Sequence, residues 1–382
     1  MDSIQLIVEY REGLNEALLS EIGRIKYKLP IIGAYVLELP ADSVKHLRGM
    51  ESIKAVYEVS NITTQSDAGF TGRGINIAIL DTGLWPAEDF TKPGNRLIAF
   101  KDFVNGRRDF YDDNGHGTHV AGIACGNGYL SGGKYRGEAT GAGIISIKVL
   151  DDEGKGSSAD VLAGLQWVAD NRNRYNIRIV NLSVGTPETG NFDPLVRAVE
   201  YIWDMGVVVA VAAGNNGPKS STVTSPGSSK KVITVGASDD DREGAYVNGR
   251  QAVNFSGRGP TLNCIVKPDI LAPGAEVISV CSKGMSQRGL EIHKKRFVGD
   301  NYLSLSGTSM SAPKVCGAIA VLLEKYPRLT PDDVKYALKK SGVDLGADPN
   351  RQGWGRLDTE ALIAGEVEHV REKSLRDSQK AK

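Results

Sequence analysis

Three short segments of this 382-residue chain each place one reactive side chain among apolar or glycine neighbours. They carry Asp81 in residues 78–83, His116 in residues 114–119 and Ser309 in residues 306–313. An imidazole oriented by a carboxylate can activate a serine hydroxyl as a nucleophile, and these segments supply all three groups. Their order along the chain and their local settings together indicate nucleophilic catalysis.

Each of these motifs also has a structural alternative. Asp81 precedes a Thr-Gly pair that is good turn chemistry. His116 and His119 are spaced one helical turn apart, so they are either structural histidines or a metal-binding pair. A plain helix N-cap remains an interpretation for Thr308 or Ser311 beside the serine.

A fourth segment fits the same chemistry. Residues 208–217 read as a buried apolar strand that ends in small residues and then Asn215. A side-chain amide at that place can donate a hydrogen bond to an oxyanion. Ser309 itself precedes an apolar helical run, where free backbone N–H groups and the helix dipole favour developing negative charge. An ordinary Asn-Gly turn is the alternative, and it describes Asn216 better than Asn215.

Composition narrows the function classes. The 46 basic and 46 acidic residues give a formal net charge of zero, so the chain has no electrostatic footprint for nucleic acid or an anionic membrane. No apolar segment approaches the roughly 20 residues that span a bilayer, and no early stretch has the pattern of a signal peptide. The four cysteines are widely spaced and suggest small buried residues rather than disulfides or metal ligands. We therefore predict a soluble cytoplasmic protein, with leaderless export as the open alternative.

The elements that must position these side chains fall into separate regions. Residues 1–62 predict a small α+β module of ferredoxin-like type, with strands at 4–8, 34–39 and 53–59 and helices at 14–25 and 41–50. A polar linker follows at 60–69.

Residues 63–365 alternate between short valine- and isoleucine-rich strands and helices. The expected strands are 75–80, 143–149, 177–182, 207–212 and 232–235, and the expected helices are 158–171, 194–205, 311–325 and 330–341. This pattern predicts an α/β fold with a doubly wound, mostly parallel sheet, whose functional groups lie at the carboxyl ends of the strands. Residues 366–382 are charged and are predicted to be a disordered tail.

The motifs resemble those of the subtilisin-like serine proteases, the subtilases, over residues 69–365. The matching segments are 81–83 (DTG), 116–122 (HGTHVAG), 213–215 (AGN) and 307–310 (GTSM), supported by 254–260 and 267–274. The loop at 134–137 and the missing signal peptide are similar to the intracellular AprX-like branch of the family.

The resemblance implies a role for each matching residue. Ser309 would be the nucleophile, His116 the general base and later the general acid, and Asp81 the residue that orients His116. Asn215 and the backbone N–H of Ser309 would form the oxyanion hole. An extended protein or peptide substrate would lie as an added strand between two edges, one at Gly154, Lys155 and Gly156 and the other at Ser183, Val184 and Gly185. Ala213, Gly214 and Thr224 would also bind substrate, with Thr224 at the base of the first specificity pocket. No cofactor is implied for the chemistry.

Residues 1–62 are similar to the inhibitory prodomain of the family, which implies a self-inhibited precursor that cuts itself within residues 59–67. Structural calcium is a family feature, but the loop 126–137 lacks the usual calcium-loop sequence. The acidic runs 151–153 and 239–241 are either calcium ligands or solvated turns. Residues 296–301 are predicted only as a loop. A catalytically silent or latent subtilase-like binding protein and an acyl transferase or ligase remain the alternative functions.

Overall fold

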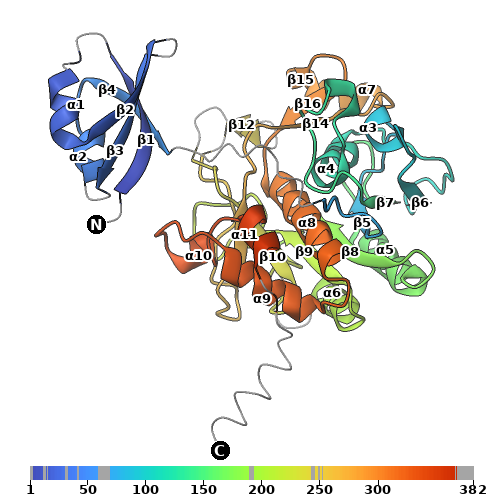
Figure 1. Ribbon diagram of the computed structural model, residues 1–382. Coiled ribbons are helices and arrows are strands. Elements are labelled where there is room, and N and C mark those ends of the chain that lie inside the picture. The colour runs from blue at the N-terminus through green and yellow to red at the C-terminus, as the bar shows by residue number, and fades with distance from the viewer. Residues whose placement is uncertain are drawn as a thin grey trace, which may run out of the picture. The chain divides into compact units, whose positions relative to one another are not determined.

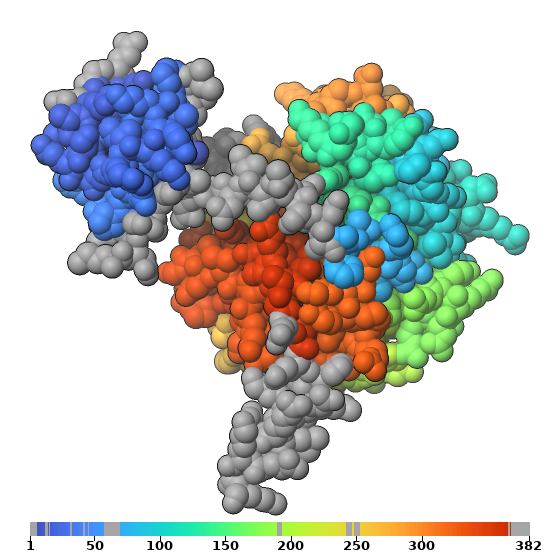
Figure 2. Space-filling view, in the orientation of Figure 1, coloured from blue at the N-terminus to red at the C-terminus, as the bar shows by residue number. Residues whose placement is uncertain are grey.

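The computed structural model describes residues 3–11, 14, 16–30, 33–40, 43–58, 69–188, 193–241, 246–247, 250–251, 253–365 and 367. The chain divides into two compact units, Met1–Gly69 and Phe70–Lys382 (Figures 1 and 2). The predicted cut region at 59–67 lies outside the described residues. The predicted tail at 366–382 does so as well, apart from residue 367.

The first unit is an antiparallel sheet with the order β2-β3-β1-β4 and two helices. Its elements are β1 (Ser3–Tyr10), α1 (Glu16–Ile22), β2 (Arg24–Leu29), β3 (Ala34–Pro40), α2 (Val44–Arg48) and β4 (Ile53–Glu58). Alternate strand residues face both helices, so one small core contains Leu6, Val8, Leu19, Leu37, Leu39, Leu47 and Ile53.

One prediction for this unit is wrong. The helix expected over 14–25 ends at Ile22, and β2 follows it. Gly23 separates the two elements, where a Cβ would lie 2.7 Å from the carbonyl oxygen of Glu38. The close approach of β3 therefore ends the helix at a residue that only glycine fits.

The second unit is built on a seven-stranded parallel sheet with the order β13-β10-β9-β8-β5-β7-β6 (Figure 1). Its strands are β5 (Asn76–Asp81), β6 (Leu97–Asp102), β7 (Gly143–Lys148), β8 (Ile177–Leu182), β9 (Val208–Ala212), β10 (Ile233–Ala237) and β13 (Ile270–Ala272). Both faces are covered, because α5 (Ser158–Asn171) and α6 (Pro194–Asp204) pack on one side and α4 (His116–Cys125) and α8 (Thr308–Lys325) on the other. The predicted doubly wound α/β fold is confirmed.

Further helices and two small antiparallel sheets, β11-β12 and β14-β16-β15, complete the described part of this unit. The remaining helical elements are α3 (Glu88–Thr91), η3 (Tyr129–Ser131), α7 (Gln287–His293), α9 (Pro331–Ser341), α10 (Pro349–Gln352) and α11 (Thr359–Ala364). The remaining strands are β11 (Tyr246–Val247), β12 (Arg250–Gln251), β14 (Val277–Val280), β15 (Phe297–Val298) and β16 (Tyr302–Leu305). The segment predicted as a loop at 296–301 therefore contains a strand, since β15 pairs with β16.

The start of the second unit is tied to the far end of α8. Glu324 Oε2 accepts hydrogen bonds from the backbone N–H groups of Thr71, Gly72 and Arg73 at 2.6, 2.7 and 3.0 Å. Three successive N–H groups that converge on one carboxylate oxygen form an anion-binding nest. Within the part of the chain that the structure describes, no helix has the length and apolar character to cross a membrane.

Candidate active site

Asp81 and His116 form a close pair at the carboxyl edge of the sheet. Asp81 ends β5, and His116 begins α4. The Oδ1 atom of Asp81 lies 2.7 Å from His116 Nδ1 and also accepts a hydrogen bond from the Thr82 N–H at 2.8 Å. Because this contact assigns the Nδ1 proton to the carboxylate side, Nε2 is left as the basic nitrogen.

The surroundings of His116 raise its pKa above 6.5. Burial by itself lowers the pKa of this imidazole, but the charge and hydrogen bond of Asp81 and the charge of Asp112 outweigh burial. A base with a raised pKa accepts a proton from a hydroxyl more readily.

Ser309 lies in the first turn of α8 and lines the same cleft as His116, which encloses about 810 Å³. Its hydroxyl donates a hydrogen bond to the carbonyl oxygen of Ser183 at 3.1 Å. No hydrogen bond joins the side chains of Ser309 and His116, both of which the structure describes. Catalytic hydrogen bonds of this kind often form only when substrate is bound.

Asn215 is held from one side of its amide. Its Oδ1 accepts hydrogen bonds from the Thr308 backbone N–H at 2.9 Å and from the Thr308 hydroxyl at 3.1 Å. The Thr308 hydroxyl oxygen also accepts a hydrogen bond from the Gly214 N–H at 3.1 Å. The amide oxygen is thereby committed to the residue before Ser309, so the Nδ2 donor is the group that remains for the cleft.

Eight of the nine predicted substrate-binding residues line this cleft: Gly154, Lys155, Gly156, Ser183, Val184, Gly185, Gly214 and Thr224. Ala213 is not brought into the lining, because it is fully buried and its N–H donates to the Val235 carbonyl at 2.8 Å. The Thr224 side chain fills the space over Gly185 and Gly214, where an added Cβ would lie 2.5 and 2.7 Å from its atoms.

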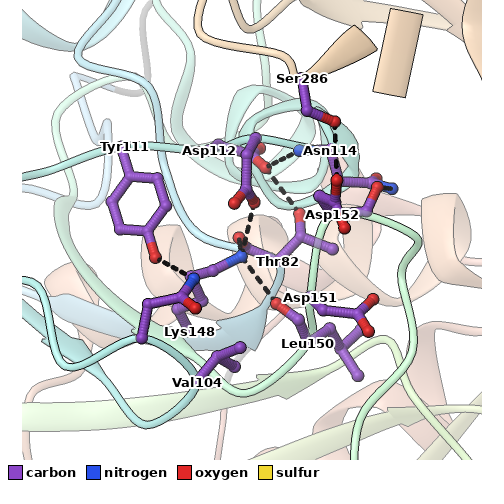
Figure 3. A network of polar contacts seen from close by, with 12 residues as sticks. Thr82, Val104, Tyr111, Asp112, Asn114, Lys148, Leu150, Asp151, Asp152 and Ser286 are labelled. Carbon is purple, nitrogen blue, oxygen red and sulfur yellow. Dashed lines mark hydrogen bonds and ion pairs between the residues drawn. The ribbon is translucent and has the colours of Figure 1, made fainter. Parts of the chain in front are cut away.

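Asp112 is a buried carboxylate that the sequence analysis missed (Figure 3). It accepts hydrogen bonds from the Thr82 hydroxyl at 2.9 Å, the Gly115 N–H at 2.8 Å and the Thr118 hydroxyl at 2.6 Å. Thr82 follows Asp81, and the other two donors flank His116. Asp112 therefore fixes the two halves of the Asp81–His116 pair to each other.

Lys148 supports the same region from below the cleft (Figure 3). Its fully buried ammonium donates to the carbonyl oxygens of Thr82 and Leu150 at 2.6 and 2.7 Å and pairs with Asp113 at 2.7 Å. A lysine inside the apolar strand 143–149 was the signal that could have found it, since a buried charge needs partners.

His119 has a structural environment. Its Nε2 lies 3.0 Å from the Val277 carbonyl oxygen and 3.1 Å from the Leu303 carbonyl oxygen, so this nitrogen carries the proton and donates to both. Among the described residues, no group of three or more His, Cys, Asp or Glu side chains is arranged to hold a metal. The geometry gives no support to a metal-binding pair of His116 and His119.

His119 makes stability dependent on pH. Burial, followed by the charge of His116, lowers the pKa of His119 to about 3, so the folded state keeps this ring neutral while the unfolded chain protonates it near 6.5. The contribution of neutral His119 to the free energy of unfolding is fully present above pH 6.5, and it falls by about 1.4 kcal/mol for each pH unit below that value. In a Ser309→Ala background, we expect His119→Gln to remove about 2 kcal/mol of the stability difference between pH 7 and pH 5. Urea unfolding at both pH values measures this, and an unchanged difference would contradict it.

One carboxylate of each acidic run is engaged by backbone groups of the chain itself. Asp151 accepts hydrogen bonds from the N–H groups of Glu153 and Lys155, both at 2.9 Å. In the other run, Asp239 accepts from the N–H groups of Gly274 and Ala275 at 2.6 and 3.0 Å. Asp151 therefore organises its own turn. Asp239 instead joins its run to a distant segment, and Asp240 of the same run is buried at 2% exposed, so the second run is not a solvated turn.

The loop at 126–137 is held by groups of the chain itself. The Asp89 carboxylate accepts hydrogen bonds from the Leu130 N–H at 2.8 Å and the Tyr302 hydroxyl at 3.0 Å. We therefore expect a calcium chelator to leave the Tm within about 1 °C, whereas Tyr302→Phe lowers it by about 2–4 °C through the loss of about 1 kcal/mol. Calorimetry of both proteins with and without chelator makes the comparison, and a large drop with chelator alone would contradict the expectation.

The fold and this site define a class of protein. The Subtilase family model matches residues 72–355, and the chain belongs to that family. It is a subtilisin-like serine endopeptidase, as the sequence motifs predicted.

Particular relatives are similar over most of the chain. The chain is 44% identical over 309 residues to "Serine protease AprX" of Bacillus subtilis (strain 168), which covers 78% of this chain and 67% of that protein. It is 31% identical over 344 residues to "Thermostable alkaline protease" of Halalkalibacterium halodurans, covering 86% of this chain and 81% of that one. The crystal structure of a cold adapted subtilisin-like serine proteinase matches with a TM-score of 0.56 and 28% identity, covering 75% of this chain and 88% of that one.

Proposed function

We propose that this endopeptidase cleaves proteins through an acyl-enzyme formed on Ser309. The observation that carries the proposal is the 2.7 Å contact of Asp81 with His116 at the cleft that Ser309 also lines. His116 Nε2 takes the proton of the Ser309 hydroxyl as Oγ attacks the carbonyl carbon, and then donates it to the leaving amine. Water then attacks the acyl-enzyme. His116 Nε2 takes a proton from the water and donates it to Ser309 Oγ, which leaves as the product acid is released.

The substrate would bind by strand addition between the Gly154–Gly156 and Ser183–Gly185 edges. The Ser183 carbonyl oxygen, which now accepts the Ser309 hydroxyl, is an acceptor that an added strand would use. A substrate N–H that takes this acceptor releases the hydroxyl, which is then free to turn toward His116. Binding and activation are coupled in this scheme.

Covalent labelling tests the proposed nucleophile. An aryl sulfonyl fluoride is expected to add to Ser309 in the wild-type protein and to abolish casein cleavage, because it transfers its sulfonyl group to an activated serine. Mass spectrometry of the labelled peptide locates the adduct, and Ser311→Ala is the matched control for a neighbouring hydroxyl. Labelling elsewhere, or casein cleavage after full labelling, would refute the proposal. A product joined to an added amine would favour the acyl transferase instead.

Asn215 is proposed to donate its Nδ2–H to the oxyanion, together with the Ser309 backbone N–H. Replacing it by leucine keeps the volume but removes the donor, so we expect kcat to fall by about 10²–10³-fold with little change in KM. Steady-state kinetics on a peptide anilide measures both constants. Asn216→Leu is the control at the adjacent residue, and equal losses in the two variants would contradict the assignment.

We further propose that the N-terminal unit is an inhibitory prodomain, so that the chain is a precursor that processes itself in the cytoplasm. The unit has its own core, and its sequence pattern is similar to that of family prodomains. The free cysteines, three buried and Cys264 exposed, suit a reducing compartment. Wild-type protein is expected to lose the unit on storage while Ser309→Ala stays intact on a denaturing gel. Full-length wild-type protein with full casein activity would refute the inhibitory role.

A further inference from the structure

The chain between β14 and β16 forms an insert, residues 282–301, that contains α7 and β15 and lies on the surface of the second unit (orange in Figure 2). The insert is fastened to the loop that carries His116. The Ser282 hydroxyl donates to the Asp112 carbonyl at 2.6 Å, and the Ser286 N–H donates to the Asp113 carbonyl at 2.8 Å. Gly289 packs so closely that an added Cβ would lie 2.6 Å from the same Asp113 oxygen.

The insert is also fastened to two other walls of the cleft. The Ser286 hydroxyl donates to Asp152 Oδ2 at 2.9 Å (Figure 3), and Arg288 lies 3.7 Å from Glu153 beside the Gly154 edge. On the far side, the Ser304 N–H donates to the Arg296 carbonyl at 2.8 Å, and Ser304 belongs to the strand that leads into Ser309. A segment held at three sides is a fixed wall of the cleft.

The wall lies on the half of the cleft that receives the leaving group. Under the proposed function, the acyl half of the substrate occupies the edges at 154–156 and 183–185. His116 donates the proton to the leaving amine, so the chain beyond the scissile bond departs on the His116 side. The residues that line the cleft there come from the insert and from the strand before Ser309, and they include Ile292, His293, Leu305 and Ser306.

The insert offers one exposed apolar side chain to the cleft, Ile292, and one cation, Arg296. Ile292 is 44% exposed, and Leu305 beside the nucleophile segment is buried at 4% exposed. His293, the next residue along the helix after Ile292, is 6% exposed. Burial, followed by the charges of His116 and Arg296, lowers the pKa of His293 to about 4, so the ring is neutral near pH 7.

We propose that Ile292 is a specificity-determining residue that selects an apolar side chain in the first two substrate positions after the scissile bond. The proposal rests on the proposed cleavage at Ser309. An apolar side chain packed on Ile292 loses water from both surfaces, whereas a lysine would be desolvated in the same cleft as the like-charged Arg296.

Leu290 provides a matched control. It lies on α7 and is 47% exposed, but it does not line the cleft. Helical residues two positions apart point in directions about 200° apart around the axis, so Leu290 and Ile292 face different directions. Ile292→Asp and Leu290→Asp therefore place the same charge on the same helix, once inside the cleft and once outside it.

The experiment uses the full-length protein after self-processing and two kinds of substrate with the same acyl half. Internally quenched peptides carry either Leu-Leu or Lys-Lys after the scissile bond, and a peptide anilide has no residues there. We expect the wild-type enzyme and Leu290→Asp to prefer the Leu-Leu peptide by about tenfold in kcat/KM, and Ile292→Asp to lose that preference. Leu290→Asp should hydrolyse the anilide within about twofold of the wild-type rate, and Ile292→Asp should lose less on the anilide than on the Leu-Leu peptide.

Two results would overturn the assignment: equal loss of preference in both variants, or an Ile292→Asp loss of the same size on the anilide and the peptides. Either result with an active wild-type enzyme leaves the proposed cleavage at Ser309 standing. A wild-type enzyme that hydrolyses neither the anilide nor the peptides refutes the proposed function itself.

Discussion

Ser309→Ala is expected to lower kcat on a peptide anilide by about 10⁶-fold, the size of the loss when subtilisin, a relative, lacks its nucleophile. The neighbouring Ser311 hydroxyl is not placed to replace it, because it donates to the Ala272 carbonyl at 2.9 Å. The residual rate would come from substrate binding and the oxyanion donors alone. The change is small in volume and removes one hydrogen bond, to Ser183, so the fold should be retained.

The measurement is single-turnover release of the anilide, with circular dichroism to confirm folding. A competitive peptide inhibitor should bind the variant with a Kd within a few fold of that of the wild-type enzyme. A loss of only tenfold would show that the attacking group lies elsewhere in the cleft.

Asp81→Asn is expected to lower kcat by about 10⁴-fold while leaving the protein folded. The amide is nearly isosteric with the carboxylate, but it can present an N–H to His116 Nδ1, which then loses its proton to the other nitrogen. Nε2 would still face the cleft, but it would carry the proton and could not accept one from Ser309. The charge that stabilises the imidazolium disappears at the same time.

The pH profile separates this explanation from simple disorder of the site. In the wild-type enzyme, Asp81 helps to raise the pKa of His116 above 6.5, so kcat/KM should rise as pH passes through that raised value. Burial is no longer outweighed by the aspartate in Asp81→Asn, so the midpoint of the rise should move to lower pH. An unchanged midpoint would show that Asp81 does not act through the imidazole.

The sequence predicted the central sheet well because β5, β7, β8, β9 and β10 are buried runs of apolar residues. It missed β6, which lies at the edge of the sheet and contains the charged residues Lys101 and Asp102. It also missed β13, which has only three residues. Short or half-exposed edge strands have no clear periodicity, so their positions depend on neighbours that are distant in the chain.

The candidate site was predicted residue by residue but not in its contacts. Motifs identified Asp81, His116 and Ser309, yet no motif specifies that the Ser309 hydroxyl donates to Ser183. Asp112 and Lys148 were missed because their partners are mostly backbone groups of other segments. The insert at 282–301 was missed for the same reason, since its place in the cleft comes from contacts with the His116 loop.

The nest that Glu324 forms with Thr71, Gly72 and Arg73 has a mechanical consequence. β5 begins only three residues after this nest and ends at Asp81. The Asp81 carboxylate therefore lies at the end of a strand whose start is held by the nest. The three charge-assisted hydrogen bonds to Glu324 hold the start of β5 in place, so a displacement or a cut in the chain before residue 71 would have to break them before it could move the strand. Since α8 also carries Ser309, one helix holds the start of β5 near its last turn and the proposed nucleophile in its first turn, so the nest links the positions of Asp81 and Ser309.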